Sequence, residues 1–450
     1  MSDIDRNAAA VRPRFGARSN TTLVFLGAAA LTLLCITVPR VAPLVAISLT
    51  AAFSVYCLVD DTRRDGWSAF KTVFFRPELL FAVWALIAVA WAPDPLRGLE
   101  KSLFLIALVL HAIILAKNFY RVDRRVVEWT ARGVLAGVIL GGFYVCFEIA
   151  TRDGLTKLLL GHFPDISRAF SKHATIKDGV IVRISGAHIT RASAVFCLLV
   201  CPALLAAALF TKGWVRWLCY GVIVAFLLLI FFHPYTHSQT AQLVIAVGAT
   251  TTALAVVAPN LARWAVAAGL AAWLFLVMPA AIALHAYGLH EDRDLFASAR
   301  VRVSIWKEAT DEILKNPILG AGTTAARYFG SSKGGPQKSG KLDPERGARG
   351  RAHFHNAYLQ TWYELGLIGI LAFALLAYSL WRRISDVPRN AALFATTHFA
   401  VCTTLIGPSY GLWQNWLQSA FALSILMVMG FASTVANPDK RSTAPPPQEG

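Results

Sequence analysis

The stretch ASAVFCLLVCPALLAAALF, residues 192–210, decides the fold class because it contains no charged side chain. An α-helix needs about 20 consecutive apolar residues to cross a hydrocarbon core roughly 30 Å thick. Charge returns beyond both ends of the stretch, with Arg191 before it and Lys212 after it. Residues 192–210 are therefore predicted to form a transmembrane helix.

The same pattern recurs along the chain of 450 residues, of which 56% are hydrophobic and only 15% are charged. A soluble domain is typically about 25% charged, so this composition disfavours a soluble globular protein. We expect an all-α integral membrane protein with about twelve transmembrane helices. The other predicted spans are Thr22–Val38, Val41–Val59, Glu78–Trp91, Ser102–Ala116, Gly133–Ala150, Val215–Phe232, Ser238–Ala258, Ala265–Ala286, Leu365–Leu380, Ala391–Ile406 and Trp416–Val435.

Positive charge divides this layout into two sides. Lys and Arg gather in both termini and in alternate short connections, which predicts that these segments are cytoplasmic. The expected order is a cytoplasmic tail (1–21), spans 1–5 (22–150), a first long outer loop (151–191), spans 6–9 (192–286), a second long outer loop (287–355), spans 10–12 (356–436) and a cytoplasmic tail (437–450).

The two long outer loops also carry many cations, in a chain whose formal net charge is +17. Long loops cross a membrane largely regardless of charge, so one interpretation is that these cations are simply tolerated there. The alternative is that a few arginines converge on an anion, for which phosphate oxygens suit the planar guanidinium. Nucleic acid is a poor candidate partner, because the loops face outward and no nucleic-acid-binding module is recognisable. We expect a membrane-borne anion.

Residues Ser298–Asn316 in the second loop are predicted to form an amphipathic helix with Ser298 as its N-cap. Arg302 lies one turn before Trp306 and therefore shares its apolar face. A charge on an apolar face needs a partner, either a bound phosphate or a carboxylate such as Asp294.

The first long loop ends in Arg183-Ile-Ser-Gly-x4-Arg191, which puts Arg183 just above the membrane and Arg191 at the start of a span. Arginine at a span end commonly snorkels to the interface. Because Arg191 faces the same compartment as Arg302, binding the same anion is the alternative interpretation.

His355 lies where the tenth span begins, at the outer surface. A helix N-terminus attracts phosphate and holds a nearby histidine neutral, and a neutral imidazole can accept a proton from an attacking hydroxyl. Tyr358 lies on about the same helix face and is a further candidate for contacting substrate. The alternative is that His353 and His355 are merely interfacial residues. A metal site is disfavoured, because no outer cysteine or clustered carboxylates complete one.

Three motifs in these segments resemble the bacterial O-antigen ligase and polymerase superfamily. His355-Asn-Ala-Tyr-Leu-Gln-x3-Glu-Leu-Gly-x2-Gly is similar to the family's H-N-x-Y-L-Q, E-L-G-x-x-G signature. Arg302-x3-Trp306, followed by Pro317-Ile-Leu-Gly-Ala-Gly, resembles its Arg-x3-Trp helix and glycine turn. The Arg183 to Arg191 segment is similar to its first long-loop pattern. One departure is Gln239, where many relatives carry arginine.

The resemblance implies a membrane glycosyltransferase fold of the GT-C class, with a polyprenyl-pyrophosphate-linked glycan as donor and no cofactor or required metal. The acidic metal motif of metal-dependent GT-C enzymes is missing from the first outer loop, residues 39–43. Carried over, Arg191 and Arg302 would grip the donor pyrophosphate, with Arg183 in a supporting role. His355 would act as the general base or position the acceptor hydroxyl, and the transfer would invert the anomeric centre.

The leading hypothesis is an O-antigen ligase of the bacterial inner membrane, which moves a glycan from undecaprenyl pyrophosphate to the lipid A core oligosaccharide at the periplasmic face. An O-antigen polymerase or a protein O-oligosaccharyltransferase would use the same donor with another acceptor. Only residues 437–450 follow the last predicted span, which weighs against the longer oligosaccharyltransferases. A transporter of an anionic lipid or solute is the rival from another class, although no internal repeat supports it.

Overall fold

The computed structural model of the chain describes residues 20–49, 51, 76–119, 122–162, 174–177, 180–184, 186–236, 238–329 and 354–436. These ranges are almost entirely helical. The α-helices are α2 (Thr21–Thr37), α4 (Leu80–Ile87), α5 (Pro95–Asn118), α6 (Arg124–Thr151), α7 (Gly154–His162), α9 (Ala187–Phe210), α10 (Gly213–Phe232), α11 (Gln239–Val257), α12 (Pro259–Phe275), α13 (Val277–Ala286), α14 (Ala297–Ile313), α15 (Ala357–Arg383), α16 (Arg389–Ile406) and α17 (Asn415–Ala436). The 3-10 helices are η1 (Pro39–Val41), η2 (Pro77–Leu79), η3 (Ala88–Trp91), η5 (Pro234–Thr236), η6 (Ala325–Tyr328) and η8 (Ile384–Asp386).

A short antiparallel hairpin, β1 (Ala174–Lys177) and β2 (Val180–Ile184), lies in the first long loop. The expectation of an all-α chain did not include it. Strand β2 reads Val-Ile-Val-Arg-Ile, and β-branched residues favour extended backbone. The difference is confined to this loop, and the bundle itself is helical.

Seven described helices are long and apolar enough to cross a membrane. Two bent pairs, Thr21–Thr37 with Pro39–Leu49 (119°) and Pro259–Phe275 with Val277–Ala286 (69°), raise the number to nine if each pair is one span. Helix α16 and residues Leu80–Trp91 lie where spans are expected; Leu80–Trp91 is apolar but short. The helices indicate a multi-pass membrane protein, and twelve spans stay a prediction.

Helices α2 and α6 pack closely through small residues. Gly133, Gly137 and Gly141 are spaced one turn apart on α6, and a Cβ atom on Gly133 would lie 2.5 Å from the carbonyl oxygen of Phe25 on α2. Small residues at this spacing let two membrane helices approach closely. Helix α9 packs against both α2 and α6. The turn η1, which follows α2, also contacts α9.

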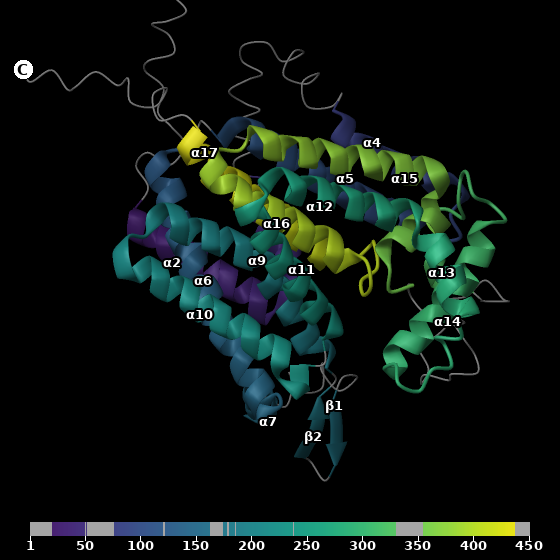
Figure 1. The fold of residues 1–450 in the computed structure, drawn as a ribbon, viewed down its shortest axis with the longest axis horizontal. Coiled ribbons are helices and arrows are strands. Elements are labelled where there is room, and N and C mark those ends of the chain that lie inside the picture. The colour runs from purple at the N-terminus through teal and green to yellow at the C-terminus, as the bar shows by residue number, and fades with distance from the viewer. Residues whose placement is uncertain are drawn as a thin grey trace, which may run out of the picture.

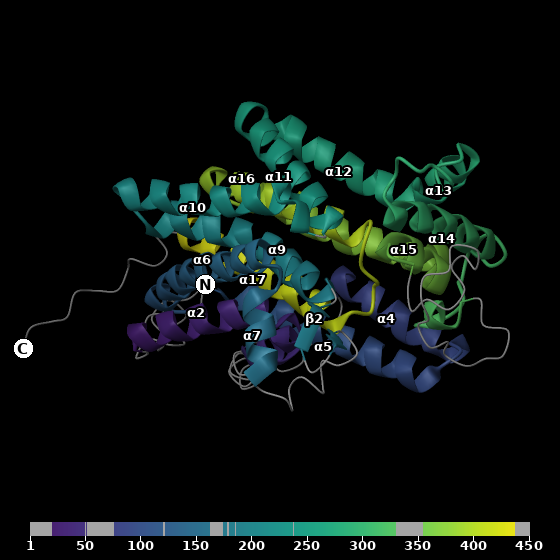
Figure 2. The same ribbon diagram turned by 90° about the horizontal axis from the view of Figure 1, so that it is seen from below.

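The ends of the bundle differ in what they carry. Figure 1 shows α7, the β1–β2 hairpin and α14 along its lower edge, whereas the end of α17 lies at the upper left. Figure 2 shows α12 and α13 on the opposite side of the bundle from α2 and α5.

Tyr328 donates its hydroxyl to Asp94 Oδ2 at 2.9 Å, and Arg383 pairs with Glu78 at 2.8 Å. Each bond joins segments expected on one side of the membrane, although the sidedness itself stays a prediction.

Helix α15 is interrupted at Gly366, whose φ of 63° lies in the left-handed region. The glycine turn, residues 317–322, packs against this break, and Gly322 N donates to the carbonyl oxygen of Glu364 at 2.9 Å. A break in a helix leaves backbone groups without intrahelical partners, and the turn supplies them. The Glu-Leu-Gly and glycine-turn motifs of the sequence therefore dock onto each other.

Gly366→Ala is expected to cost about 2 kcal/mol or more of stability, because alanine is strained at positive φ. Its Cβ would also lie 2.2 Å from the carbonyl oxygen of Ile318. Gly269→Ala in α12 is the matched control, since nothing lies within 4 Å of its added Cβ. Thermal unfolding in detergent should show a lower midpoint for the Gly366 variant alone. Equal midpoints for the two variants would contradict the proposed docking.

Candidate active site

Segments that are far apart in sequence meet at the loop between α16 and α17, residues 407–414, named here the 407–414 loop. Nδ1 of His355 lies 3.1 Å from the carbonyl oxygen of Ser409. The neighbouring Tyr410 is buried and donates its hydroxyl to the carbonyl oxygen of Thr190 at 3.2 Å. Thr190 directly precedes Arg191 on α9, so this loop links the His355 segment to the Arg191 segment.

Two arginines lie within electrostatic reach of Tyr410. Burial raises the pKa of the Tyr410 phenol, and the positive charges of Arg191 on α9 and Arg302 on α14 act in the opposite direction. Such effects require short distances or partial burial, because water screens charges that are far apart. The structure therefore brings Arg191, Arg302 and His355 together around Ser409 and Tyr410.

Arg191 lies in the second turn of α9 and is half-buried. Within the described part of the chain, no hydrogen bond or ion pair engages its guanidinium. A partly buried charge without a counter-charge is costly, and a second cation nearby adds to that cost. These surroundings favour an anionic ligand at Arg191 over simple snorkelling.

The backbone of His355 is held in an uncommon conformation. Its φ is 54°, a left-handed value, and Asn356 then caps α15 by accepting a hydrogen bond from Leu359 N at 3.0 Å. Because the carbonyl oxygen of Ser409 can only accept, the proton between the two groups belongs to Nδ1 of His355. The lone pair of the neutral imidazole is then on Nε2. This tautomer suits a group that accepts a proton from a hydroxyl.

Helix α14 fixes the residue before His355. The indole N–H of Trp306 donates to the carbonyl oxygen of Phe354 at 2.9 Å. The Phe354 ring is buried against Phe329 and Tyr363, at centroid distances of 4.9 and 5.1 Å. The Arg302-x3-Trp306 motif thus provides both a cation for the site and an anchor for the His355 segment.

The start of α14 differs from the prediction. The helix begins at Ala297 with Phe296 in the N-cap position, so Ser298 as N-cap is wrong. The Ser298 hydroxyl instead donates to Gln239 Oε1 on α11 at 3.0 Å. A tertiary partner therefore takes the hydroxyl that would have capped the helix.

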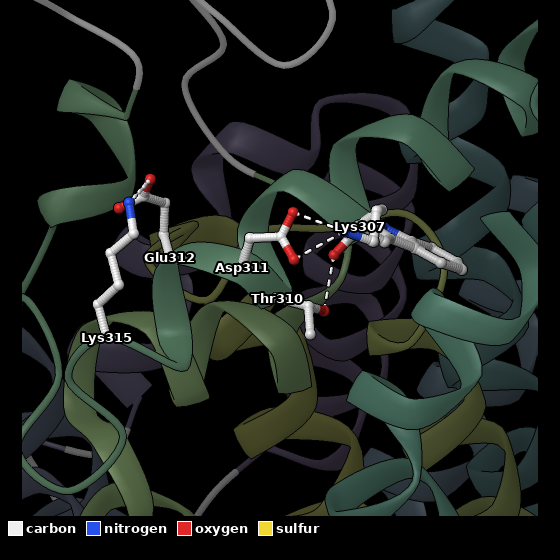
Figure 3. Close-up of polar contacts among 6 residues, drawn as sticks. Lys307, Thr310, Asp311, Glu312 and Lys315 are labelled. Carbon is white, nitrogen blue, oxygen red and sulfur yellow. Dashed lines mark hydrogen bonds and ion pairs between the residues drawn. The ribbon is translucent and has the colours of Figure 1, made fainter. Parts of the chain in front are cut away.

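Lys307 of α14 and Lys315, which follows the helix, each pair with a carboxylate of α14. Lys307 Nζ lies 2.7 Å from Asp311 Oδ2, and Lys315 Nζ lies 2.6 Å from Glu312 Oε1. Figure 3 shows these four side chains. Exposed pairs of this kind add little stability, but each lysine already has a carboxylate partner. Lys307 and Lys315 are therefore poor candidates for binding an anion.

Polar residues of the His-Asn motif hold the 407–414 loop in place. Gln360 Oε1 accepts from Leu412 N at 3.0 Å, and its Nε2 donates to the buried Glu364 at 2.9 Å. Glu364 also accepts from the indole N–H of Trp413 and from Ala326 N. A buried carboxylate needs several donors, and these satisfy it. The roles of Gln360 and Glu364 are structural.

Two other predicted residues lie apart from this convergence. Tyr358 is buried, stacks on Trp273 and donates its hydroxyl to the carbonyl oxygen of Thr403 at 2.8 Å. These contacts account for Tyr358 as a core residue. Arg183 lies on β2 opposite Thr175, and its side chain is outside the described residues. Substrate contact by Tyr358 or Arg183 stays a prediction.

A cavity of about 520 Å³ begins beside the 407–414 loop, at Gly411 and Leu412. It lies between α5, α15, α16 and α17, and its lining is mostly apolar, with Leu108, Phe373 and Phe399 among the side chains. An apolar chain is the kind of ligand that such a lining favours.

The described residues contain no group of three or more His, Cys, Asp or Glu that could hold a metal ion. The rings of His285 and His290 stack at 3.9 Å, and Glu291 Oε1 lies 3.4 Å from His290 Nε2, but these side chains do not form such a group. His353 and His237 lie outside the described residues. Independence from metal stays a prediction.

Sequence analysis missed the residues at the centre of the convergence, Ser409 and Tyr410. A Gly-Pro-Ser-Tyr-Gly run separates the last two predicted spans, on the side expected to be outer. Such runs mark turns, and an aromatic residue in an outer turn could have attracted notice. Nothing local indicated that the turn would touch three other segments.

The chain is similar to known proteins over part of its length. Residues 224–374 match the family model described as O-antigen ligase. This segment of the chain resembles O-antigen ligases. It contains Arg302 and His355, while Arg191 precedes it and the 407–414 loop follows it.

Proteins similar to this chain include Rickettsia proteins named "Putative polysaccharide ligase". The Rickettsia conorii protein is 30% identical over 132 residues, which cover 29% of this chain and 31% of that protein. The Rickettsia typhi protein is 28% identical over 145 residues, covering 32% and 34%. Over a longer match, the Rickettsia bellii protein is 23% identical across 373 residues, covering 81% and 82%. The first two matches therefore span about a third of each relative's length.

Proposed function

We propose that the protein is an O-antigen ligase of the bacterial inner membrane, which transfers a glycan from undecaprenyl pyrophosphate to the lipid A core oligosaccharide at the periplasmic face. The observation that carries the proposal is the convergence of Arg191, Arg302 and His355 on the 407–414 loop. The match of residues 224–374 to the O-antigen ligase family model and the names of the similar proteins support a ligase-type role.

The donor is inferred from charge and from the apolar cavity. Arg191 and Arg302 would bind the pyrophosphate group, since guanidinium groups form paired hydrogen bonds with phosphate oxygens. The cavity beside Gly411 and Leu412 is suited to part of the polyprenyl chain. One ligand that joins a diphosphate to a long apolar chain satisfies both features.

The proposed transfer is a single displacement. The acceptor hydroxyl oxygen forms a bond to the anomeric carbon while the bond from that carbon to the pyrophosphate oxygen breaks. The leaving pyrophosphate takes the electron pair, and the hydroxyl proton passes to Nε2 of His355. Arg191 and Arg302 stabilise the negative charge that develops on the leaving group, which is commonly the largest contribution to catalysis. One displacement inverts the configuration at that carbon.

Reconstitution tests the proposal directly. Purified protein in detergent or nanodiscs is incubated with a glycan on undecaprenyl pyrophosphate and with lipid A core, and mass spectrometry follows the joined product. We expect product and free undecaprenyl pyrophosphate in equal amounts. Absence of product with an active reference ligase as the positive control would refute the proposal.

Gels of lipopolysaccharide from a deletion strain separate the ligase from its rivals. A ligase deletion leaves uncapped core alone, whereas a polymerase deletion leaves core capped with a single repeat. Unchanged lipopolysaccharide together with unglycosylated exported proteins would indicate a protein O-oligosaccharyltransferase. Flux of lipid through protein-containing liposomes without transfer would indicate a transporter.

Trp306→Phe is expected to reduce transfer about tenfold. The substitution keeps an aromatic ring at this position but removes the indole N–H that donates to the carbonyl oxygen of Phe354. Loss of one neutral hydrogen bond weakens an anchor by roughly 1 kcal/mol, and small displacements of a catalytic group have large kinetic effects. The loss should appear in kcat, since His355 shifts while the arginines stay. Trp264→Phe, at an exposed tryptophan of α12, is the control. Equal rates for the two variants would contradict the anchoring role.

A further inference from the structure

Arg40 lies close to Arg191 although the two are far apart in sequence. It belongs to η1, at the 119° bend between Thr21–Thr37 and Pro39–Leu49. Buried Pro39 anchors this turn, which contacts α9, the helix that carries Arg191. The Arg40 side chain is exposed, and its charge acts on Arg191. A third arginine therefore lies near Arg191, one of the two already assigned to the site.

The two cations are not balanced by a carboxylate. Within the described ranges, neither Arg40 nor Arg191 forms an ion pair or a hydrogen bond through its side chain. Two like charges at short range repel, and partial burial of one of them strengthens the effect. An anion between them would remove the repulsion.

Other cations expected on the same side have carboxylate neighbours. Arg97 lies beside Asp94 and Glu100, and its positive charge stabilises both carboxylates. Lys101 pairs with Glu100 at 2.8 Å. Among the described residues, Arg97 and Lys101 therefore have neighbouring carboxylates, whereas Arg40 and Arg191 do not.

We propose that Arg40 is a third cation of the donor site and that it makes the site select a diphosphate over a monophosphate. The inference rests on the proposed function. A diphosphate carries more negative charge than a phosphomonoester and offers oxygens on two phosphorus atoms. Arg191 and Arg302 can engage one phosphate between them, and Arg40 supplies the guanidinium for the other.

Binding of two lipids without a glycan tests this inference. Undecaprenyl pyrophosphate and undecaprenyl phosphate are titrated against the full chain in nanodiscs, and native mass spectrometry measures each dissociation constant. Arg40→Ala should weaken binding of the diphosphate lipid about ten- to hundredfold, the range expected for a charge-assisted hydrogen bond. Binding of the monophosphate lipid should change less than about twofold, as expected for a site that binds one phosphate without Arg40.

Three variants complete the design. Arg40→Lys should restore part of the diphosphate affinity, because it keeps the charge but loses the planar fork. Arg97→Ala is the matched control and should bind both lipids as the unchanged protein does. Arg191→Ala should weaken binding of both lipids. Thermal midpoints in detergent check that each variant is folded.

The outcomes separate this inference from the proposed function. Wild-type binding by Arg40→Ala, together with weak binding by Arg191→Ala, would overturn the role of Arg40 and leave the donor site intact. Equal weakening for the two lipids in Arg40→Ala would overturn the selectivity. Failure of the unchanged protein to bind either lipid would refute the proposed donor and the inference with it.

Discussion

Replacing His355 with asparagine is expected to reduce glycan transfer by about 10²- to 10⁴-fold, the range that a positioned general base contributes. Asparagine accepts the left-handed backbone that His355 adopts, with φ of 54°, so the start of α15 should keep its geometry. It cannot take a proton from the acceptor hydroxyl. The asparagine variant therefore removes the chemistry with little change to the fold.

The measurement is a single-turnover rate with saturating donor and acceptor, so that weak binding does not hide the chemical step. His355→Ala provides the comparison, because alanine adds backbone strain to the loss of the imidazole. The two variants should be equally slow, while His355→Ala should have the lower thermal midpoint. Transfer at the wild-type rate by His355→Asn would exclude His355 as the base.

Replacing Arg191 with alanine is expected to reduce transfer by about 10²- to 10³-fold, as removal of one preorganised donor to a developing negative charge commonly does. Stability should respond differently. No described residue pairs with Arg191, so its removal relieves repulsion from Arg40 without orphaning a partner. The thermal midpoint should be unchanged or slightly higher, which is typical of residues kept for function.

Lys315→Ala is the control for loss of charge, because Lys315 is an exposed cation that already pairs with Glu312. Its transfer rate should match that of the unchanged protein. The transfer rate of Arg191→Lys should fall between those of Arg191→Ala and the unchanged protein, since lysine keeps the charge but lacks the planar guanidinium. A lower thermal midpoint for Arg191→Ala would instead mean that the guanidinium has a structural role.

Long apolar stretches predicted the positions of helices more reliably than any other local feature of the sequence. Residues 192–210 lie within α9, and 215–232 lie within α10, because a helix in lipid must satisfy its own backbone groups and needs no distant partner. The ends of helices were less predictable. Ser298 does not cap α14 because Gln239 of another helix takes its hydroxyl.

The motifs identified candidate residues, but they did not show which of those residues have structural roles and which lie at the candidate site. The His-Asn segment combines a histidine at the site with Gln360 and Glu364, which hold the 407–414 loop and the backbone of residues 324–326. Tyr358 shares the motif yet lies buried with its hydroxyl bonded to Thr403. Residues of one short motif face different surroundings, because successive side chains of a helix point in different directions.

The sequence by itself determined the membrane class, the helical spans and the identity of the cations and histidine, since these depend on hydrophobicity and residue chemistry within single segments. Only the tertiary structure decided that Arg191 and Arg302 lie near Tyr410, that Arg40 lies near Arg191, and that His355 contacts the 407–414 loop. Distances between segments depend on how helices pack, as at the glycines of α6 that bring α2 close. Packing is a property of pairs of surfaces, and no single segment contains it.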